Sequence, residues 1–262
     1  MKKDLNYMLL AETALLAGEI MLVSGAETYR VEDTACRILK TSGLERAEAF
    51  VVSTGIFVTL SDPQIAPISM VRRVGEKNTN LGNISETNEI SRKYCGGQIS
   101  LEEAYRGICE IVERKRYPEW IRSLCTILST FFFCIILGGG IIESVLSMIN
   151  GAFIVLWDYV LRRARTKTFL QNVLSSLFIA CFSTAVAAFS GNRIDSEPMI
   201  AGSIMPLLPG VAITNAIRDT LQGDYVSGGG RIIEAFVIAL SIAVGIGAGL
   251  ALGNLMAGGI EL

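Results

Sequence analysis

The part of the chain that follows Ser123 consists of long apolar runs separated by short polar connections. Only 15 of the 48 Asp, Glu, Lys and Arg residues lie there. A helix needs roughly 17 to 25 mostly apolar residues to cross about 30 Å of hydrocarbon. Five runs have about this length, at 124–142, 145–161, 169–189, 199–217 and 232–256. We therefore expect an α-helical transmembrane bundle of about five helices in a lipid bilayer.

The preceding 120 residues are more polar and are numerous enough to bury a core of their own. Apolar residues at helical spacing alternate with short runs rich in Val, Ile, Phe and Thr. The predicted elements are helices at 5–24, 27–40, 85–94 and 101–116 and strands at 47–52, 56–60 and 68–74. Ser100 and Glu103 form a capping box. We predict an α+β cytoplasmic domain, residues 1–120, and a transmembrane domain, residues 121–262.

Lys and Arg residues are distributed unevenly around the predicted spans. Four lie before the first span, four follow the second, and the connection 138–144 has none. Cytoplasmic connections carry the excess of positive charge, and the N-terminal stretch has no signal-peptide core. We expect the N-terminus inside and the C-terminus outside a bacterial cytoplasmic (inner) membrane. The flanking residues are Arg114, Lys115, Arg116, Arg122, Arg162, Arg163, Arg165 and Lys167.

Composition argues against several classes of function. The net charge is −2, so nucleic acid is a poor partner. The chain contains no His, which excludes His-dependent catalytic triads within it and the usual His-containing zinc sites. Its six Cys residues have no C-x-x-C spacing, which indicates inert thiols in a reducing compartment. We expect neither a cofactor nor a metal site.

The fourth apolar run contains the sequence PLLPG, with Pro206, Pro209 and Gly210, and Asn215 follows shortly after. Two prolines three residues apart remove backbone donors and should kink or unwind a helix. Bare backbone at membrane depth is tolerated against protein or beside a water-filled cavity. The break therefore indicates either a permeation path or a structural kink.

Few ionisable residues lie in or beside the apolar runs, and such residues are functional candidates because burial in a membrane is costly. Asp158 and Glu234 stand close to basic residues, so ion pairing at the cytoplasmic interface is the alternative. Asn150 is an uncharged candidate for the lining of a polar path. The remaining candidates are Glu143, Asn172, Arg218, Asp219 and Asp224.

The last apolar run carries small residues at every fourth position, which draws a stripe for close helix packing. The partner is either another helix of this chain or a second copy in a higher oligomer. The stripe consists of Ser241, Gly245, Gly249, Gly253 and Ala257.

The segment 25–33, GAETYRVED, is dense in groups that form hydrogen bonds. Glu27, Arg30, Asp33 and Arg37 stand three or four residues apart, so a ladder of salt bridges on a solvated helix face is one interpretation. A functional network is the other.

At this segment the chain resembles the threonine/serine exporter family, and more closely the larger subunit of its split, two-component branch, which includes a succinate exporter. The resemblance covers nearly the whole chain in the right order. It rests on 25–33, the STG turn at 53–55, Arg72 and Arg73, Asn80 and Leu81, PLLPG at 206–210 and the segment 218–228.

The resemblance implies export of a small hydrophilic metabolite, threonine or serine or a dicarboxylate such as succinate, driven by the membrane potential or a proton gradient. It also implies a second small polytopic membrane subunit, because the fused members have roughly ten spans. The competing hypothesis is a membrane-tethered hydrolase that uses Ser53, Thr54 and the acidic residues of 27–33, and a third is a scaffold without transport. The expected path or coupling residues are Glu27, Arg30, Asp33, Thr54, Asn150, Asp158, Pro206, Pro209, Gly210, Asn215 and Asp219.

Overall fold

The computed structural model describes residues 6–75, 78–114, 117–163, 168–191 and 193–258, which form two compact units. The first unit contains the described residues up to Arg114 together with Gly210–Ile233. The second contains those from Tyr117 to Pro209 and from Glu234 onward. The division at 120/121 stays a prediction, but the sheet-bearing unit also includes a segment from the apolar half of the chain.

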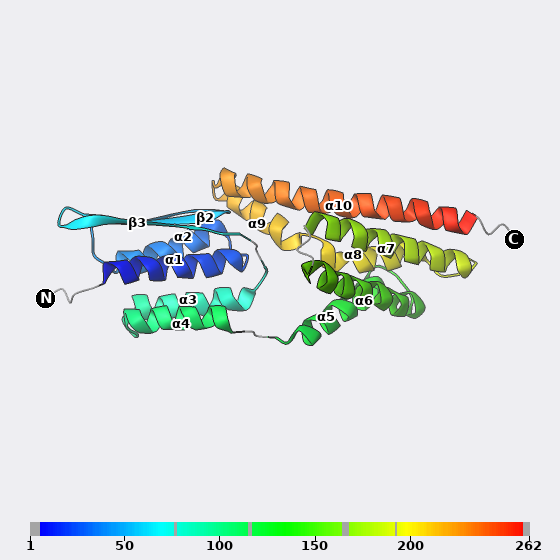
Figure 1. The fold of residues 1–262 in the computed structure, drawn as a ribbon, viewed down its shortest axis with the longest axis horizontal. Coiled ribbons are helices and arrows are strands. Elements are labelled where there is room, and N and C mark those ends of the chain that lie inside the picture. Colours follow the sequence, from blue (N-terminus) through cyan, green and yellow to red (C-terminus); the bar gives the residue numbers. More distant parts are fainter. Residues whose placement is uncertain (1–5, 76–77, 115–116, 164–167, 192, 259–262) are drawn as a thin grey trace. The chain divides into compact units, whose positions relative to one another are not determined.

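The first unit is built in layers around a three-stranded antiparallel sheet of order β1-β2-β3 (Figure 1). Helices α1 and α2 pack against the sheet, and α3 and α4 cover α1 on its other side. The bounds are α1 Tyr7–Val23, α2 Thr28–Lys40, β1 Arg46–Val52, β2 Gly55–Asp62, β3 Ile65–Arg73, α3 Leu81–Cys95 and α4 Leu101–Glu113. The expected hairpin and capping box are confirmed.

The core of this unit lies between the sheet and α1. Ile56, Val58 and Leu60 alternate along β2 and are buried, as the two-residue period of a strand requires. Gly18 of α1 faces Ile56, and a Cβ atom there would lie 3.0 Å from its Cδ1 atom. The absence of a side chain at residue 18 therefore lets helix and sheet approach closely.

The second unit is a bundle of apolar helices. Its helices are α5 Glu119–Ile136, α6 Ile141–Arg163, α7 Thr168–Phe189, α8 Ser196–Ile204 and η1 Met205–Leu207, with most of α10 Tyr225–Gly258. Within the described chain, α5, α6, α7 and α10 are each long and apolar enough to cross a membrane. The helix of the first span, α5, lies earlier in the chain than the apolar run 124–142. It starts directly after Pro118 and ends before Gly138, whose φ is +92°.

The predicted span over 199–217 is not one continuous helix. The helix α8 ends at Ile204, a 3-10 turn follows to Leu207, and α9 Gly210–Leu221 begins after Pro209. Leu208 is extended, with φ −68° and ψ 136°, as the residue before a proline prefers. The two pieces together pass as one broken span or as a re-entrant loop. The expected break at PLLPG is thus confirmed.

The small-residue stripe of α10 packs against α7 of the same chain. Cβ atoms at Gly249 and Gly253 would lie 2.7 Å from Ala180 and 2.8 Å from Thr184. Side chains there would push the two helices apart. The contact with another helix of this chain, one of the two alternatives, is therefore present.

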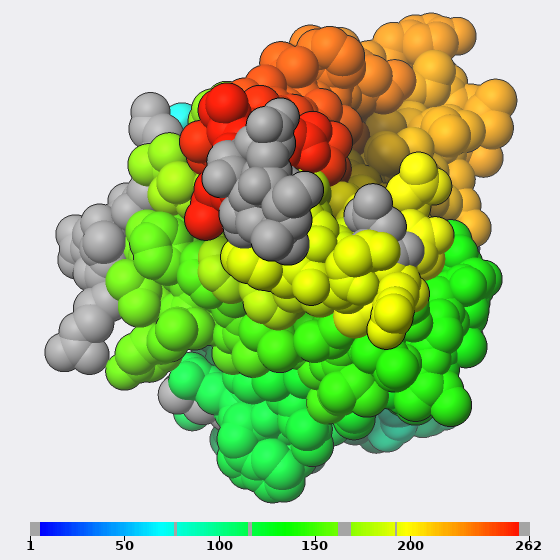
Figure 2. Space-filling model, turned by 90° about the vertical axis from the view of Figure 1, so that its right-hand side faces the viewer, coloured from blue at the N-terminus to red at the C-terminus, as the bar shows by residue number. Residues whose placement is uncertain are grey.

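The α5–α6 connection, the α7–α8 connection and the end of α10 lie at one end of the bundle (Figure 1). Figure 2 looks onto this end, where the residues that follow α7 and the end of α10 are neighbours on the surface. The start of α5, where Arg122 lies, belongs to the opposite end of the bundle. This arrangement has the alternation of ends that a multi-pass helical protein requires.

Candidate functional site

The connection between α1 and α2 is a tight corner of four residues, 24–27. Gly25 has a φ of +86°, a conformation that residues with side chains rarely adopt. The N–H of Ala26 donates to the Met21 carbonyl at 3.0 Å, and the N–H of Gly25 donates to the Leu22 carbonyl at 3.2 Å. This pair of bonds is the Schellman pattern that ends a helix. The GAE sequence thus turns the chain sharply into α2.

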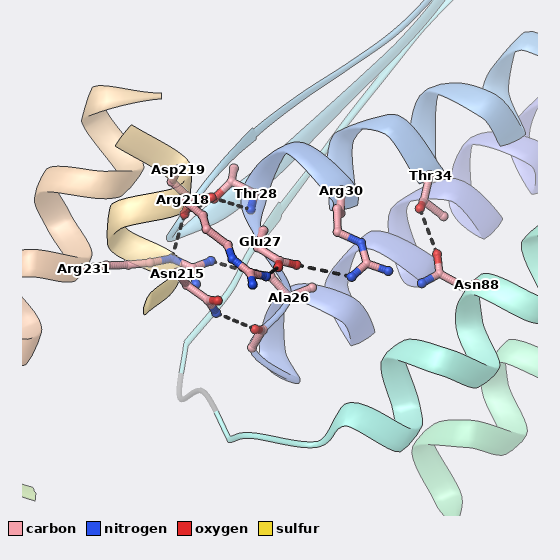
Figure 3. Close-up of polar contacts among 11 residues, drawn as sticks. Ala26, Glu27, Thr28, Arg30, Thr34, Asn88, Asn215, Arg218, Asp219 and Arg231 are labelled. Carbon is pink, nitrogen blue, oxygen red and sulfur yellow. Dashed lines mark hydrogen bonds and ion pairs between the residues drawn. The ribbon is translucent and has the colours of Figure 1, made fainter. Parts of the chain in front are cut away.

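Helix α9 and the first turns of α10 bind this corner residue by residue, all within the first unit (Figure 3). Asn215, Arg218 and Asp219 share one face of α9, because residues three and four apart are neighbours on a helix. The contacts join Gly25 to Asn215, Ala26 to Arg231, Glu27 to Arg218 and Thr28 to Asp219. Four successive residues, Gly25 to Thr28, are therefore held by side chains from the far end of the sequence. We call this segment, 25–28, the GAET corner.

Two of these contacts satisfy backbone carbonyls of the corner. The amide of Asn215 donates to the Gly25 carbonyl at 2.7 Å. Nη2 of Arg231 donates to the Ala26 carbonyl at 2.9 Å. Buried carbonyls need such partners, since a lost hydrogen bond is costly away from water.

Asp219 caps the N-terminus of α2. Its Oδ1 atom accepts the N–H of Thr28 at 3.0 Å, and its Oδ2 atom accepts the Thr28 hydroxyl at 3.0 Å. Glu27 occupies the N-cap position of α2 but makes no capping bond with its side chain. A carboxylate at a helix N-terminus is also favoured by the helix dipole. Asp219 thus replaces the missing local cap.

Asp219 and Arg231 form a buried ion pair, with Nε of Arg231 3.2 Å from Oδ2 of Asp219. Asp219 is 0% exposed and Arg231 is 4% exposed. Removing one member of such a pair leaves an uncompensated buried charge. The two residues therefore depend on each other, and together they tie α9 and α10 to the corner.

Glu27 is a buried carboxylate shared by two arginines. Arg218 donates to its Oε1 atom, and Nη1 of Arg30 lies 3.5 Å from its Oε2 atom. Burial raises the pKa of Glu27, but a backbone hydrogen bond and the two guanidinium groups outweigh it, so the pKa lies below its ordinary value. Glu27 is therefore ionised at neutral pH.

A pocket of about 640 Å³ opens beside this network. Its lining comes from the corner and from α2, α3 and α9, all in the first unit. The charged residues of the lining are Glu27, Arg30, Glu89, Arg92 and Arg218. A volume of this order holds a small metabolite with room to spare.

The predicted site residues of α2 divide between the pocket and the surface. Arg30 lines the pocket, whereas Asp33 pairs with Arg37 on the exposed side of α2 at 2.8 Å. Two of the three pairs of the expected salt-bridge ladder are formed, Arg30 with Glu27 and Arg37 with Asp33. The ladder explains Asp33 and Arg37, but Glu27 also binds Arg218 and faces inward.

Thr54 and the PLLPG residues do not line this pocket. Thr54 is exposed in the β1–β2 turn, and its carbonyl accepts the Val74 N–H at 2.9 Å. Pro206 lies in η1, and Gly210 begins α9 directly after Pro209. The chain that leaves the break thus enters the helix that holds the corner.

Asn150 and Asp158 lie in the second unit, and both have partners there. The Asn150 amide is fully buried and donates to the hydroxyls of Ser183 at 3.2 Å and Ser203 at 3.0 Å. These bonds connect α6, α7 and α8. Asp158 accepts from the Gln171 amide at 2.7 Å and lies 4.0 Å from Arg122, so it pairs with a basic residue as the alternative expected.

Two residues of the site, Thr28 and Arg231, are not among the candidate residues from the sequence, and only their buried contacts reveal them. Arg218 is among the ionisable candidates, and it shares a face of α9 with Asn215 and Asp219. The other flanking residues Lys115, Arg116, Arg165 and Lys167 lie outside the described residues.

The sequence of this chain is similar to those of known proteins. The family model described as "Putative threonine/serine exporter" matches residues 12–253. The "Threonine/serine exporter" of Corynebacterium glutamicum is 24% identical over 91% of this chain and 50% of its own length. The "Probable threonine/serine exporter" of Mycobacterium tuberculosis is 23% identical over 93% of this chain and 46% of its own length. This chain thus spans about half the length of these two relatives.

A third relative is comparable in length. The "Probable succinate transporter subunit YjjP" of Escherichia coli is 23% identical over 87% of this chain and 89% of its own length. No solved structure gives a significant match. The apolar helices and these relatives identify a multi-pass membrane protein. Because the family model matches nearly the entire sequence, the chain belongs to the threonine/serine exporter family.

Proposed function

We propose that this protein is a subunit of a secondary transporter that exports a small hydrophilic metabolite across the cytoplasmic membrane. Its substrate is threonine or serine, or a dicarboxylate such as succinate, the compounds that appear in the relatives' names. The N-terminus lies inside and the C-terminus outside. A second small polytopic subunit completes the transporter, which is supported by the word "subunit" in the E. coli relative's name.

One observation carries this proposal: the helix that follows the PLLPG break is bound to four successive residues of the GAET corner. Discontinuous helices are a common device of secondary transporters, because their free ends and bare backbone meet solutes and ions. A change at the break therefore acts directly on α9, and α9 acts on the corner beside the pocket. We propose that this contact couples the cytoplasmic unit to transport.

The hydrolase hypothesis has less support. Ser53 and Thr54 stand in the β1–β2 turn, and neither lines the pocket that contains Glu27. The N–H of Ser53 donates to the Ser227 hydroxyl at 3.2 Å, which is a structural contact between the turn and α10. Activated nucleophiles need a base within hydrogen-bond reach. The arrangement favours transport over hydrolysis.

The test is efflux from proteoliposomes that contain the purified protein with or without a co-purified second membrane subunit. Vesicles are preloaded with radiolabelled threonine, serine or succinate, and efflux is followed under an imposed membrane potential or pH gradient. We expect efflux of one class of solute in the two-subunit vesicles and little with this chain alone. The proposal would be contradicted if, in both preparations, the solute left the vesicles without dependence on the gradient and no faster than from protein-free liposomes.

A further inference from the structure

We propose that the pocket between α2, α3 and α9 is a binding site for the carboxylate group of a small metabolite. The identity of the metabolite rests on the proposed function, whereas the carboxylate specificity rests on the residues that line the pocket.

The lining carries more positive than negative charge. Arg30, Arg92 and Arg218 face two glutamates, Glu27 and Glu89. Both oxygens of Glu27 already have guanidinium partners. Guanidinium groups bind carboxylates through two parallel N–H donors, which makes arginine the preferred residue for such ligands.

The second glutamate of the lining is also compensated, by a residue outside the pocket. Nζ of Lys93 lies 2.7 Å from Oε1 of Glu89. Arg92, by contrast, has no ion-pair partner in the part of the chain that the structure describes. The pocket therefore holds an uncompensated guanidinium that is available to a ligand.

The neutral groups of the pocket add donors. The Thr34 hydroxyl donates to Oδ1 of Asn88 at 3.2 Å, which leaves the NH₂ group of Asn88 to donate (Figure 3). Ser85 contributes an exposed hydroxyl. An anion is the ligand that such a set of donors satisfies.

Apolar groups and helix ends complete the site. Leu81 and Val211 stand in the first turns of α3 and α9, so the positive ends of two helix dipoles belong to the lining. Ile84 supplies apolar surface beside the arginines. This combination fits a short aliphatic carboxylate better than a fully polar anion such as inorganic phosphate.

The test is direct binding to the full-length protein in detergent or nanodiscs, without any gradient. Radiolabelled succinate and threonine are the probes, and unlabelled succinamide, the neutral analogue of succinate, and inorganic phosphate are the competitors. We expect saturable binding of at least one carboxylate that succinamide fails to displace. Displacement by phosphate as effective as displacement by the unlabelled carboxylate would overturn the assignment to carboxylates.

Two pairs of variants locate the site. Arg92→Ala should weaken binding about tenfold or more, whereas Arg106→Ala, on the exposed surface of α4 and outside the lining, should leave it unchanged. Ser85→Glu places a competing carboxylate in the pocket and should abolish binding, and Ser85→Gln, of similar size and neutral, should retain most of it. Equal binding by Arg92→Ala and the wild type would overturn the inference.

The two proposals fail in different ways. Efflux that persists while the purified protein binds no carboxylate, or binds it independently of Arg92, refutes the pocket and leaves the transporter. Saturable, Arg92-dependent binding without efflux under any gradient refutes the transporter and leaves the pocket.

Discussion

Asp219 accepts both the backbone N–H and the hydroxyl of Thr28, so a carboxylate 191 residues along the chain caps the second helix. Both residues lie in the first unit, and Asp219 is fully buried. A local N-cap contributes about 1 kcal/mol to helix stability. This remote cap also fixes the position of α9 relative to the corner.

Replacement of Asp219 by Ala should destabilise the protein by about 3 to 5 kcal/mol, because Arg231 is left as an uncompensated buried charge. Asp219→Ala combined with Arg231→Met should recover a substantial part of that loss. The measurement is thermal unfolding of the purified variants in one detergent. A double variant no more stable than Asp219→Ala would show that the pair is not coupled.

The contribution of Glu27 to stability should depend on pH. Its pKa in the folded protein lies below the ordinary value of 4.5, because its hydrogen bonds and two guanidinium groups outweigh the effect of burial. A group with a lowered pKa stabilises the folded state above its unfolded pKa and loses that effect as pH falls through the folded pKa.

The comparison for this prediction is wild type against Glu27→Gln. The difference in melting temperature should be constant near neutral pH and should shrink between about pH 5 and pH 3. A difference that grows as the pH falls would have the wrong sign for an ionised, paired Glu27.

Arg30→Ala should reduce efflux strongly while the free energy of unfolding changes by no more than about 0.5 kcal/mol. Its side chain is 44% exposed, so the loss of its pair with Glu27 costs little stability, but it lines the pocket. Arg37→Ala on the same helix is the matched control, since Arg37 pairs with Asp33 away from the pocket. Equal effects of the two substitutions on efflux, or a loss that merely follows protein abundance, would favour a structural role.

The proline break should be required for transport. Changing Pro206 and Pro209 together to Ala restores two backbone donors and favours a continuous helix, so efflux should fall by about tenfold or more while stability is kept or rises. The paired control is Leu207→Ala with Leu208→Ala, which should act mainly through packing. Normal efflux by the double proline variant would mean that the break is only a packing kink.

A cysteine at Thr214 tests whether the helix after the break faces water. Thr214 is exposed, whereas the neighbouring Asn215 is buried and bonded to Gly25. In a background without the native cysteines, Thr214→Cys should react with small water-soluble reagents and be protected by transported solute. An inert cysteine would remove this helix from the expected path. A cysteine at residue 215 should react much less, because that position is buried.

Much of the fold could be predicted from local signals. The period of the apolar residues marks the helices, and the STG turn marks the β1–β2 hairpin. The start of α10 was harder to predict, because Gly228, Gly229 and Gly230 are typical of a loop. The helix continues through them because Gly228 lets α10 approach the Ala216 carbonyl, 3.0 Å from where a Cβ atom would lie.

The candidate site could be predicted only in part. Glu27 and Arg30, which were chosen for charge and spacing, line the pocket, and so does Asn215, an uncharged candidate that follows the PLLPG break. The pairing of Thr28 with Asp219 could not be found, because a single sequence carries no record of a contact between such distant residues. The bonds from Asn150 to Ser183 and Ser203 were missed for a related reason, since buried serines in apolar helices resemble packing residues.

The central claim is that the contact between α9 and the GAET corner serves transport. It is tested most directly by efflux of preloaded threonine, serine and succinate from membrane vesicles of the native host, in which any partner subunit is present. The strain lacks the chromosomal copy of the protein and is complemented with wild type or with Arg218→Ala at equal abundance. The account predicts gradient-driven efflux with wild type and a loss of about tenfold or more with Arg218→Ala, since Arg218 binds Glu27 through a charge-assisted hydrogen bond. Efflux by Arg218→Ala equal to that of wild type, or no efflux of any of the three solutes above the deletion strain, would contradict it.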